Sequence, residues 1–119
     1  MARIIEKPQI IKAAGNKIKI IEEFFGRVTS NTDEVSIAKM KSPQGWEEPG
    51  QCPEFNEYTV VLKGTLSVKT KDKTFEVNAG QGILCPKNEW VQYSSPYDGG
   101  AEYIAVCLPA FSPNTVHRD

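Results

Sequence analysis

Short apolar stretches dominate the chain from Lys17 onwards. β-Branched and aromatic residues are concentrated in them, and Gly, Pro, Asn and Asp residues separate one from the next. Turn signals recur at intervals of about 8–12 residues, which is typical of all-β sandwiches and barrels. The stretches that fit strands are KIKIIEEFFGRVTS, EVSIAKM, EYTVVL, TLSVKT, KTFEVN, GILCP, WVQYSS and AEYIAVCL. The pattern therefore predicts an all-β fold.

The segment that precedes these stretches has a different pattern. Pro8 to Gly15, PQIIKAAG, has a proline near its beginning and a glycine at its end. This arrangement is typical of a short helix, because proline fits the first turn and glycine fits the C-terminal cap. We therefore expect a short N-terminal helix before the first strand.

Two of the expected strands, EYTVVL and AEYIAVCL, carry apolar residues on both sides. In EYTVVL the side opposite Glu57 consists of Tyr58, Val60 and Leu62. A small barrel has one side of each strand inside, so the outer side is normally polar. Either another part of the chain covers this apolar side, or another subunit does. We expect a homodimer, because symmetric dimers are the commonest assembly.

Length and composition restrict the possible functions. A chain of 119 residues with 39% hydrophobic residues fits one domain with a modest core. The net charge of −1 argues against a nucleic-acid-binding protein, which usually has a basic surface. Apolar runs are too short to span a membrane, and the N-terminus does not resemble a signal peptide. The odd number of cysteines does not suggest a disulfide framework. These features predict a cytoplasmic protein.

Two segments have a regular spacing of glycine, proline and polar residues. The first contains Gly45, Gln51, Pro53, Glu57 and Gly64, and the second contains Gly80, Pro86, Asn88, Val91 and Ser95. With the fifteen residues between them, they resemble the two motifs of the cupin superfamily, G-x5-H-x-H-x3-E-x6-G and G-x5-P-x-G-x2-H-x3-N. The chain is similar to small one-domain cupins such as the cupin part of the ethanolamine-utilisation Q protein.

This resemblance implies a double-stranded β-helix, or jelly roll. It divides a single domain, residues 1–119, into an N-terminal helix with strands (1–44), the two motifs (45–108) and a C-terminal tail (109–119). At the positions of the cupin metal ligands the chain has Gln51, Pro53, Glu57 and Val91. Proline and valine have no donor atom and an amide is a weak ligand, so we expect no metal and no other cofactor. A weak metal site on Glu57 and Gln51 is a remote alternative.

The resemblance also places Glu57 inside the barrel. It either forms a buried hydrogen bond with a neighbour, or it has a raised pKa and transfers protons or binds a ligand. Gln51 and Tyr93 are the expected polar partners of Glu57 and of the ligand. Val91 is expected as a wall residue, and Cys107 as the cysteine nearest the cavity.

Four other residues are weaker candidates. His117, the single histidine, is expected at the surface, with folding back over the barrel mouth as the alternative. Trp46 is expected either to close the mouth or to fill the core, and Trp90 to pack between sheets or subunits. Cys52 is expected to point outwards, and the cysteines as a group lack the spacing of a structural zinc site.

These residues favour a metal-free protein that binds a small molecule, as an accessory protein or sensor in a metabolic pathway. The alternative is a metal-independent isomerase, epimerase or lyase that acts on a sugar or small carboxylic acid and uses Glu57, with Tyr93, as acid and base. A structural protein whose barrel is filled by side chains is the third possibility.

Overall fold

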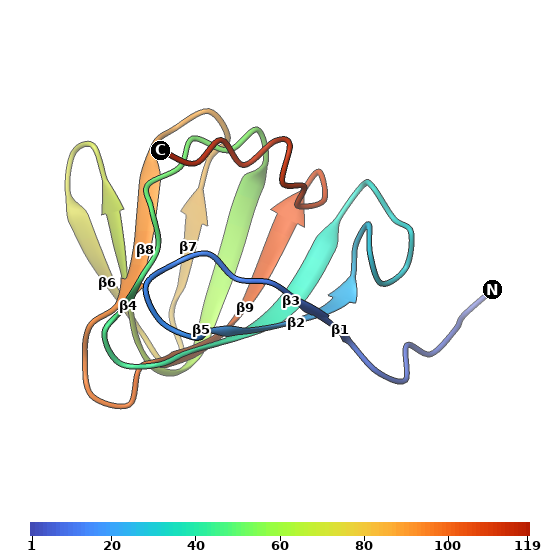
Figure 1. The fold of residues 1–119 in the computed structure, drawn as a ribbon, viewed down its shortest axis with the longest axis horizontal. Helices are drawn as coiled ribbons and strands as arrows, with labels where there is room; N and C mark the ends of the chain where they lie inside the picture. The colour runs from blue at the N-terminus through green and yellow to red at the C-terminus, as the bar shows by residue number, and fades with distance from the viewer.

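The computed structural model describes residues 1–119, which form nine β-strands and no helix (Figure 1). The strands are β1 (Gln9–Ile11), β2 (Ile20–Phe25), β3 (Ser36–Ser42), β4 (Trp46–Glu47), β5 (Asn56–Thr70), β6 (Thr74–Asn78), β7 (Gly82–Cys85), β8 (Val91–Ser95) and β9 (Ala101–Leu108). The all-β prediction is confirmed. The structure contains no helix long and apolar enough to cross a membrane.

The strands form two sheets that curl around a common interior. Sheet A has the order β1-β2-β3-β9-β5-β7, and sheet B has the order β4-β8-β5-β6, with antiparallel pairing throughout. Because β5 belongs to both sheets, its first half faces β7 and β9, and its second half faces β6 and β8. This arrangement is the jelly roll that the cupin resemblance implies.

The bend that takes β5 from one sheet to the other is at Gly64. The sequence suggested two strands, EYTVVL and TLSVKT, with a turn between them, but the backbone continues through Gly64 as one strand. Gly64 has φ +74°, and a Cβ atom there would lie 2.1 Å from the carbonyl oxygen of Gly100. Glycine therefore allows the strand to bend tightly against the β8–β9 connection.

The N-terminal helix prediction is wrong. Part of the Pro8–Gly15 segment is β1, in which Gln9 pairs with Glu23 and Ile11 pairs with Ile21 of β2. A helix of this length gains little from its own hydrogen bonds, whereas the edge of β2 offers a full set of backbone partners. Gly15 then turns the chain with φ +123°, close against the indole of Trp46.

Two segments close the barrel on the side where the sheets diverge (Figure 1). The β1–β2 loop reaches β4: Asn16 N donates to Glu47 O, and Trp46 Nε1 donates to Ala14 O at 3.0 Å. The C-terminal tail runs along the rim. Its backbone bonds with the segment 50–54 through Cys52 N to His117 O, Glu54 N to Thr115 O, and Asp119 N to Gly50 O. These ties hold both segments beside the interior cavity.

The interior consists of two apolar clusters separated by polar side chains. The larger cluster lies mainly towards sheet B and includes Trp46, Leu66 and Val68, and Tyr103 joins it from β9. The smaller one, Phe55, Cys107 and Val116, lies beneath the C-terminal tail. Trp46 is only 1% exposed, so of its two expected roles it fills the core.

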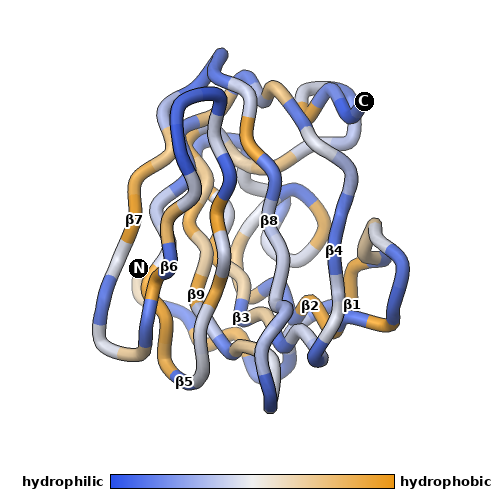
Figure 2. The backbone as a smooth tube through the Cα atoms, turned by 90° about the vertical axis from the view of Figure 1, so that its left-hand side faces the viewer, coloured by the Kyte–Doolittle hydropathy of each residue, from blue (hydrophilic) through white to orange (hydrophobic).

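The outer side of sheet A is apolar and exposed, as the sequence of β5 suggested. Figure 2 shows hydrophobic residues along β7, β9 and part of β5. Tyr58 pairs with Leu84 of β7 and with Val106 of β9, so these side chains form one surface with Val60 and Leu62. Leu84 and Val60 are each 51% exposed. No other part of the chain covers this surface, so it is available for contact with a second subunit.

Candidate functional site

Glu57 is buried at the inner face of β5. Its neighbours on the strand, Asn56 and Tyr58, alternate with it, and its own exposure is 9%. The pKa of Glu57 is raised to about 7, mainly by burial and also by the negative charge of Glu48, while Lys19 and the Tyr93 hydroxyl offset part of the rise. At neutral pH the protonated and ionised forms of Glu57 are therefore both well populated.

Gln51 and Tyr93 face the same cavity as Glu57. The backbone of Gln51 exchanges two hydrogen bonds of 2.9 Å with Val91, which fixes Gln51 beside β8. Gln51 Oε1 and the Tyr93 hydroxyl are both buried and have no hydrogen-bond partner in the chain. The Tyr93 hydroxyl is near enough to Glu57 and to the Cys85 thiol for both to influence its pKa, but it forms a well-oriented bond with neither. Buried polar atoms without partners in the chain are rare, so these two atoms are available to form hydrogen bonds with a ligand or with water.

Glu48 is a second carboxylate at this cavity, and the sequence reasoning did not find it. It follows β4 in the segment that carries Gln51, and its exposure is 8%. Burial raises the pKa of Glu48, while the positive charges of Lys19 and Arg118 lower it in part. Glu57 therefore has a titratable partner, a condition that acid–base chemistry usually requires.

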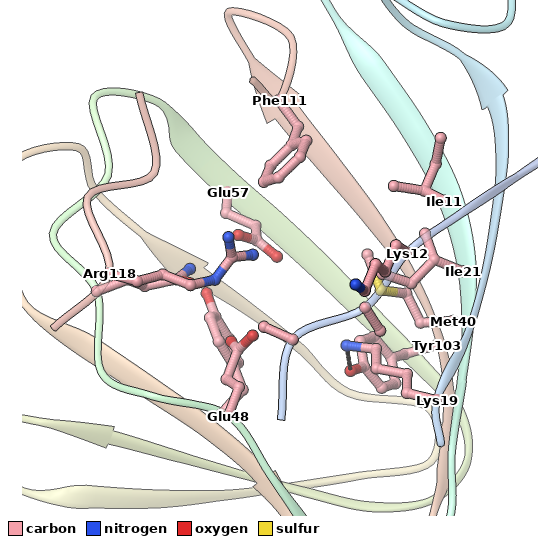
Figure 3. A pocket seen from close by; sticks show the side chains of 14 residues that line it. Ile11, Lys12, Lys19, Ile21, Met40, Glu48, Glu57, Tyr103, Phe111 and Arg118 are labelled. Atoms are coloured by element: carbon pink, nitrogen blue, oxygen red, sulfur yellow. Dashed lines mark hydrogen bonds between the residues drawn. The ribbon is translucent and has the colours of Figure 1, made fainter. Parts of the chain in front are cut away.

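Three basic residues at the cavity, Lys12, Lys19 and Arg118, were also missed. Lys19, just before β2, donates from Nζ to the Tyr103 hydroxyl at 2.7 Å and lies 4.0 Å from the centre of the Trp46 ring. Arg118, in the C-terminal tail, reaches the cavity because its backbone forms a bridge with Gln51. Figure 3 shows the guanidinium of Arg118 pointing into the cavity from the side opposite Lys12.

The cavity between these residues is small. Its volume is about 60 Å³, and the apolar part of its wall includes Ile21, Met40 and Phe111 (Figure 3). This volume is sufficient for a few water molecules or a ligand of few atoms, and it is well below that of a pocket for a drug-sized molecule. A larger ligand requires the C-terminal tail or the β1–β2 loop to move.

Not all the residues suggested by the sequence line this cavity. Gln51, Glu57 and Tyr93 do, whereas Val91 is buried beside it in the main core and Cys107 lies in the smaller apolar cluster. Burial raises the pKa of Cys107 well above that of a free thiol, so the thiol stays protonated. Both residues support the wall from behind.

His117 and Trp90 lie outside the cavity. His117 Nε2 contacts Glu54 Oε2 at the surface, and Trp90 Nε1 donates to Asp119 Oδ2 at 3.0 Å. The tail does fold back over the barrel, but it is Arg118, the neighbour of His117, that enters the mouth. Trp90 covers Gly50 and holds the tail, and no second subunit is needed to explain its packing.

The three cysteines are separate and free, with Cys52 exposed and Cys85 and Cys107 buried, in agreement with the expected outward position of Cys52. No three His, Cys, Asp or Glu side chains of the chain come together as metal ligands. At the cupin metal positions, Gln51, Pro53, Glu57 and Val91 offer one carboxylate and one amide, a donor set that does not fit a transition metal.

A larger hollow of about 620 Å³ lies between the β5–β6 turn and the β7–β8 segment, next to the main apolar cluster. Phe75, Ile83 and Trp90 line it, together with Val91. Apart from Gln51, Thr59 and Tyr93, none of which lines this hollow, every buried side-chain polar atom has a hydrogen-bond partner. The inner cavity is therefore the better candidate.

Comparison with known protein families agrees with this geometry. Residues 53–117 match the family described as the AraC-like ligand binding domain. The chain belongs to this family. The matched residues of this AraC-like ligand binding domain include Glu57, Tyr93 and Phe111 of the cavity wall, whereas Gln51 and Arg118 lie just outside the match.

Individual relatives cover different shares of this AraC-like domain. A Myxococcus xanthus protein named endoribonuclease YbeY is 41% identical over 101 residues, which are 85% of this chain and 34% of that protein. The chain thus spans about a third of that relative. EutQ from Clostridium difficile has a TM-score of 0.65 at 22% identity, over 78% of this chain and 64% of that chain. The polyketide cyclase RemF from Streptomyces resistomycificus has a TM-score of 0.74 at 17% identity, over 99% and 84%. The cupin fold is confirmed.

Proposed function

We propose that this chain binds a small organic molecule in the inner cavity without a metal ion, through Glu57, Gln51 and Tyr93. One observation carries the proposal: Gln51 Oε1 and the Tyr93 hydroxyl are buried without partners at the cavity that Glu57 also faces. Leaving such atoms unpaired destabilises a fold by about 1–3 kcal/mol each, and a ligand with matching groups removes that penalty. Membership of a ligand binding family supports the same conclusion.

Thermal-shift screening of sugars and organic acids tests this proposal. A ligand that raises the Tm of the wild type is expected to have no effect on the Tm of Glu57→Gln, because the amide changes the charge and the hydrogen bonding inside the cavity. Glu47→Gln is the matched control, since Glu47 is exposed and lies next to Glu48 in the sequence. An equal shift for Glu57→Gln and the wild type removes Glu57 from the site.

A second candidate function is metal-independent acid–base catalysis on a sugar or small carboxylic acid. Glu48 favours it, because Glu57 then has a carboxylate partner and the pKa of Glu57 is about 7. Glu57 takes a proton from the substrate, and Glu48 or Tyr93 completes the transfer. A ligand found by screening is incubated in D2O and followed by NMR. Deuterium enters a C–H position if the wild type is an enzyme of this kind, and not with Glu57→Gln.

We propose an accessory or sensor role for this binding activity. The Myxococcus xanthus relative is about three times as long as the matched region, so a domain like this one occurs next to other sequence. The nuclease name is that of the longer protein, and the net charge of −1 gives this chain little attraction for nucleic acid. Titration with RNA is expected to leave the Tm unchanged, whereas binding would contradict this role.

A homodimer through the outer side of sheet A is the assembly that we propose. Tyr58, Val60, Leu62 and Leu84 are between 41% and 51% exposed on one continuous surface. Light scattering is expected to give twice the mass of the 13.2 kDa chain. Val60→Lys is expected to give the monomer, and Val28→Lys, at an exposed apolar residue of the β2–β3 loop, is expected to remain dimeric. A monomeric wild type contradicts the dimer.

We propose a cytoplasmic location, which the free cysteines support. Cys52 is exposed and forms no disulfide, a state that a reducing compartment maintains. Fractionation of the source cells tests this, and recovery outside the cytoplasm contradicts it.

A further inference from the structure

The charged residues around the inner cavity do not pair with one another. The salt bridges of the chain, Lys63–Glu102 and His117–Glu54, both lie elsewhere. Lys19 and Arg118 are near enough to Glu48 to influence it, yet neither forms a salt bridge with it. Opposite charges that line one cavity without pairing leave room for a polar ligand between them.

These groups are also sorted by depth. The hydrogen-bonding groups of the floor, from Gln51, Glu57 and Tyr93, are at most 9% exposed. The cations are further out: Lys19 is half-buried, and Lys12 and Arg118 are exposed. Figure 3 shows Lys12 and Arg118 entering from opposite sides with their nitrogen atoms directed into the cavity. The site therefore has a neutral-to-acidic floor and a basic rim.

The polar atoms of the floor can be satisfied by one ligand group that both donates and accepts hydrogen bonds. Gln51 Oε1 is an acceptor without a donor, and the Tyr93 hydroxyl needs an acceptor for its proton. A ligand hydroxyl satisfies both atoms, whereas an ammonium group donates but does not accept. The basic side chains of the rim favour an anion, because guanidinium and ammonium groups bind carboxylates through charge-assisted hydrogen bonds.

We propose that the ligand is a small hydroxy acid, with its carboxylate between Arg118 and Lys12 at the rim and its hydroxyl between Gln51, Tyr93 and Glu57 at the floor. This inference rests on the proposed function, since it names the ligand class of the same cavity. The volume of about 60 Å³ restricts the ligand in the closed structure to a few heavy atoms. The remaining groups are placed accordingly: Lys19 lies beside the carboxylate and Glu48 beside the hydroxyl end.

Four three-carbon probes of nearly equal size test the two halves of this proposal separately. Lactate carries both the carboxylate and a hydroxyl, propionate lacks the hydroxyl, 1,2-propanediol lacks the carboxylate, and alanine has an ammonium group in place of the hydroxyl. Calorimetric titration of the whole chain is expected to give the tightest binding for lactate. Removal of either group is expected to weaken binding about tenfold or more, the size of one charge-assisted hydrogen bond.

Variants assign each half to its residues. Arg118→Gln is expected to weaken lactate binding about tenfold and to leave 1,2-propanediol unaffected. Arg27→Gln, which removes an exposed arginine in the β2–β3 loop, is the matched control and is expected to bind lactate like the wild type. Tyr93→Phe is expected to reduce the difference between lactate and propionate. Lys12→Gln, at an exposed side chain, is a second rim variant and is expected to weaken lactate binding in the same way as Arg118→Gln.

Each result decides between the ligand class and the site itself. Equal binding of lactate and propionate, or tighter binding of alanine, overturns the hydroxyl assignment. Lactate binding that Arg118→Gln and Lys12→Gln leave unchanged overturns the rim assignment. Binding of neutral polyols or sugars that depends on Glu57 but not on Arg118 overturns the hydroxy-acid class and leaves the proposed function intact. Both proposals fail if none of the four probes binds and if no compound of a wider panel gives a Tm shift that Glu57→Gln removes. In that case water molecules alone bridge the charges.

Discussion

In the first half of β5, polar residues lie on the buried side and apolar residues on the exposed side, the reverse of the usual pattern in a small β-protein. Glu57 and Thr59 point into the barrel and are at most 9% exposed, whereas Tyr58, Val60 and Leu62 point outwards and are at least 41% exposed. Folding alone favours the reverse arrangement, with apolar residues inside and polar residues in water. The two buried polar residues on the inner side and the exposed apolar residues on the outer side therefore each need a reason beyond folding.

The two reasons are separate because the two sides are physically separate. The inner side converges on unpaired buried atoms and unpaired charges, which supports ligand binding. The outer side is a continuous apolar surface on β5, β7 and β9 with no part of the chain over it, which supports association. Variants on one side should therefore change ligand binding or pH dependence, and variants on the other should change assembly.

The largest effect is expected from Glu57 through the pH dependence of stability. Its pKa is about 7 in the folded protein against an ordinary value of 4.5. Between these values the folded state holds a proton that the unfolded chain releases, so this stability is complete below pH 4.5 and is lost as the pH rises through 7. The loss amounts to about 3 kcal/mol of unfolding free energy. Urea unfolding at pH 5 and pH 8 measures most of this loss.

Glu57→Gln and Glu47→Gln form the control pair for this measurement. The amide of Glu57→Gln does not ionise, so most of the decrease between pH 5 and pH 8 is expected to disappear, and the remainder comes from Glu48, whose pKa is also raised. Glu47→Gln is expected to keep the full decrease. If both variants and the wild type decrease equally, Glu57 is not the buried carboxyl of the inner side.

Val60 and Val61 compare the two sides directly, since they are adjacent in β5. Val61 is 1% exposed and belongs to the main core, whereas Val60 is 51% exposed. Val61→Ala is expected to lower the unfolding free energy by about 2 kcal/mol, because it removes two buried methyl groups and leaves a cavity. Val60→Ala is expected to cost less than about 0.5 kcal/mol in the monomer.

Urea unfolding of both valine variants at two protein concentrations also reports on assembly. If the outer side is a dimer interface, the cost of Val60→Ala grows with protein concentration and that of Val61→Ala does not. Equal costs for the two variants at every concentration would mean that β5 does not have one buried and one open side.

The sequence predicted those features that depend on local alternation. The strands, the apolar outer side of β5 and the inward position of Glu57 all follow from period-two patterns and the cupin spacing. The helix at Pro8–Gly15 was wrong because β2 offers its edge to that segment, which no local signal in the segment reveals. In the same way, Gly64 marks a bend within one strand and not a turn between two.

The rim of the cavity could not be predicted, because it is assembled by long-range pairing. Arg118 lies in a tail without periodicity, and it reaches the cavity only because its backbone pairs with Gln51. His117, one residue earlier, is a more familiar functional residue, but it points to Glu54 at the surface. Glu48 and Lys19 are ordinary charged residues whose proximity depends on β4 and the β1–β2 loop lying side by side.

The smallest effect is expected from a charge on the outer surface. Lys63 Nζ lies 3.7 Å from Glu102 Oε2, and the side chain of Lys63 is 79% exposed. Lys63→Met is expected to change the unfolding free energy by less than about 0.5 kcal/mol, since water and salt screen an exposed pair. Lys19→Met is the matched inner variant. It removes the bond to Tyr103 and the contact with the Trp46 ring, and it is expected to cost about 1–2 kcal/mol. Urea unfolding in low and high salt distinguishes the two variants. If Lys63→Met lowers the unfolding free energy as much as Lys19→Met does, and still does so in high salt, the inner and outer charges contribute equally to stability.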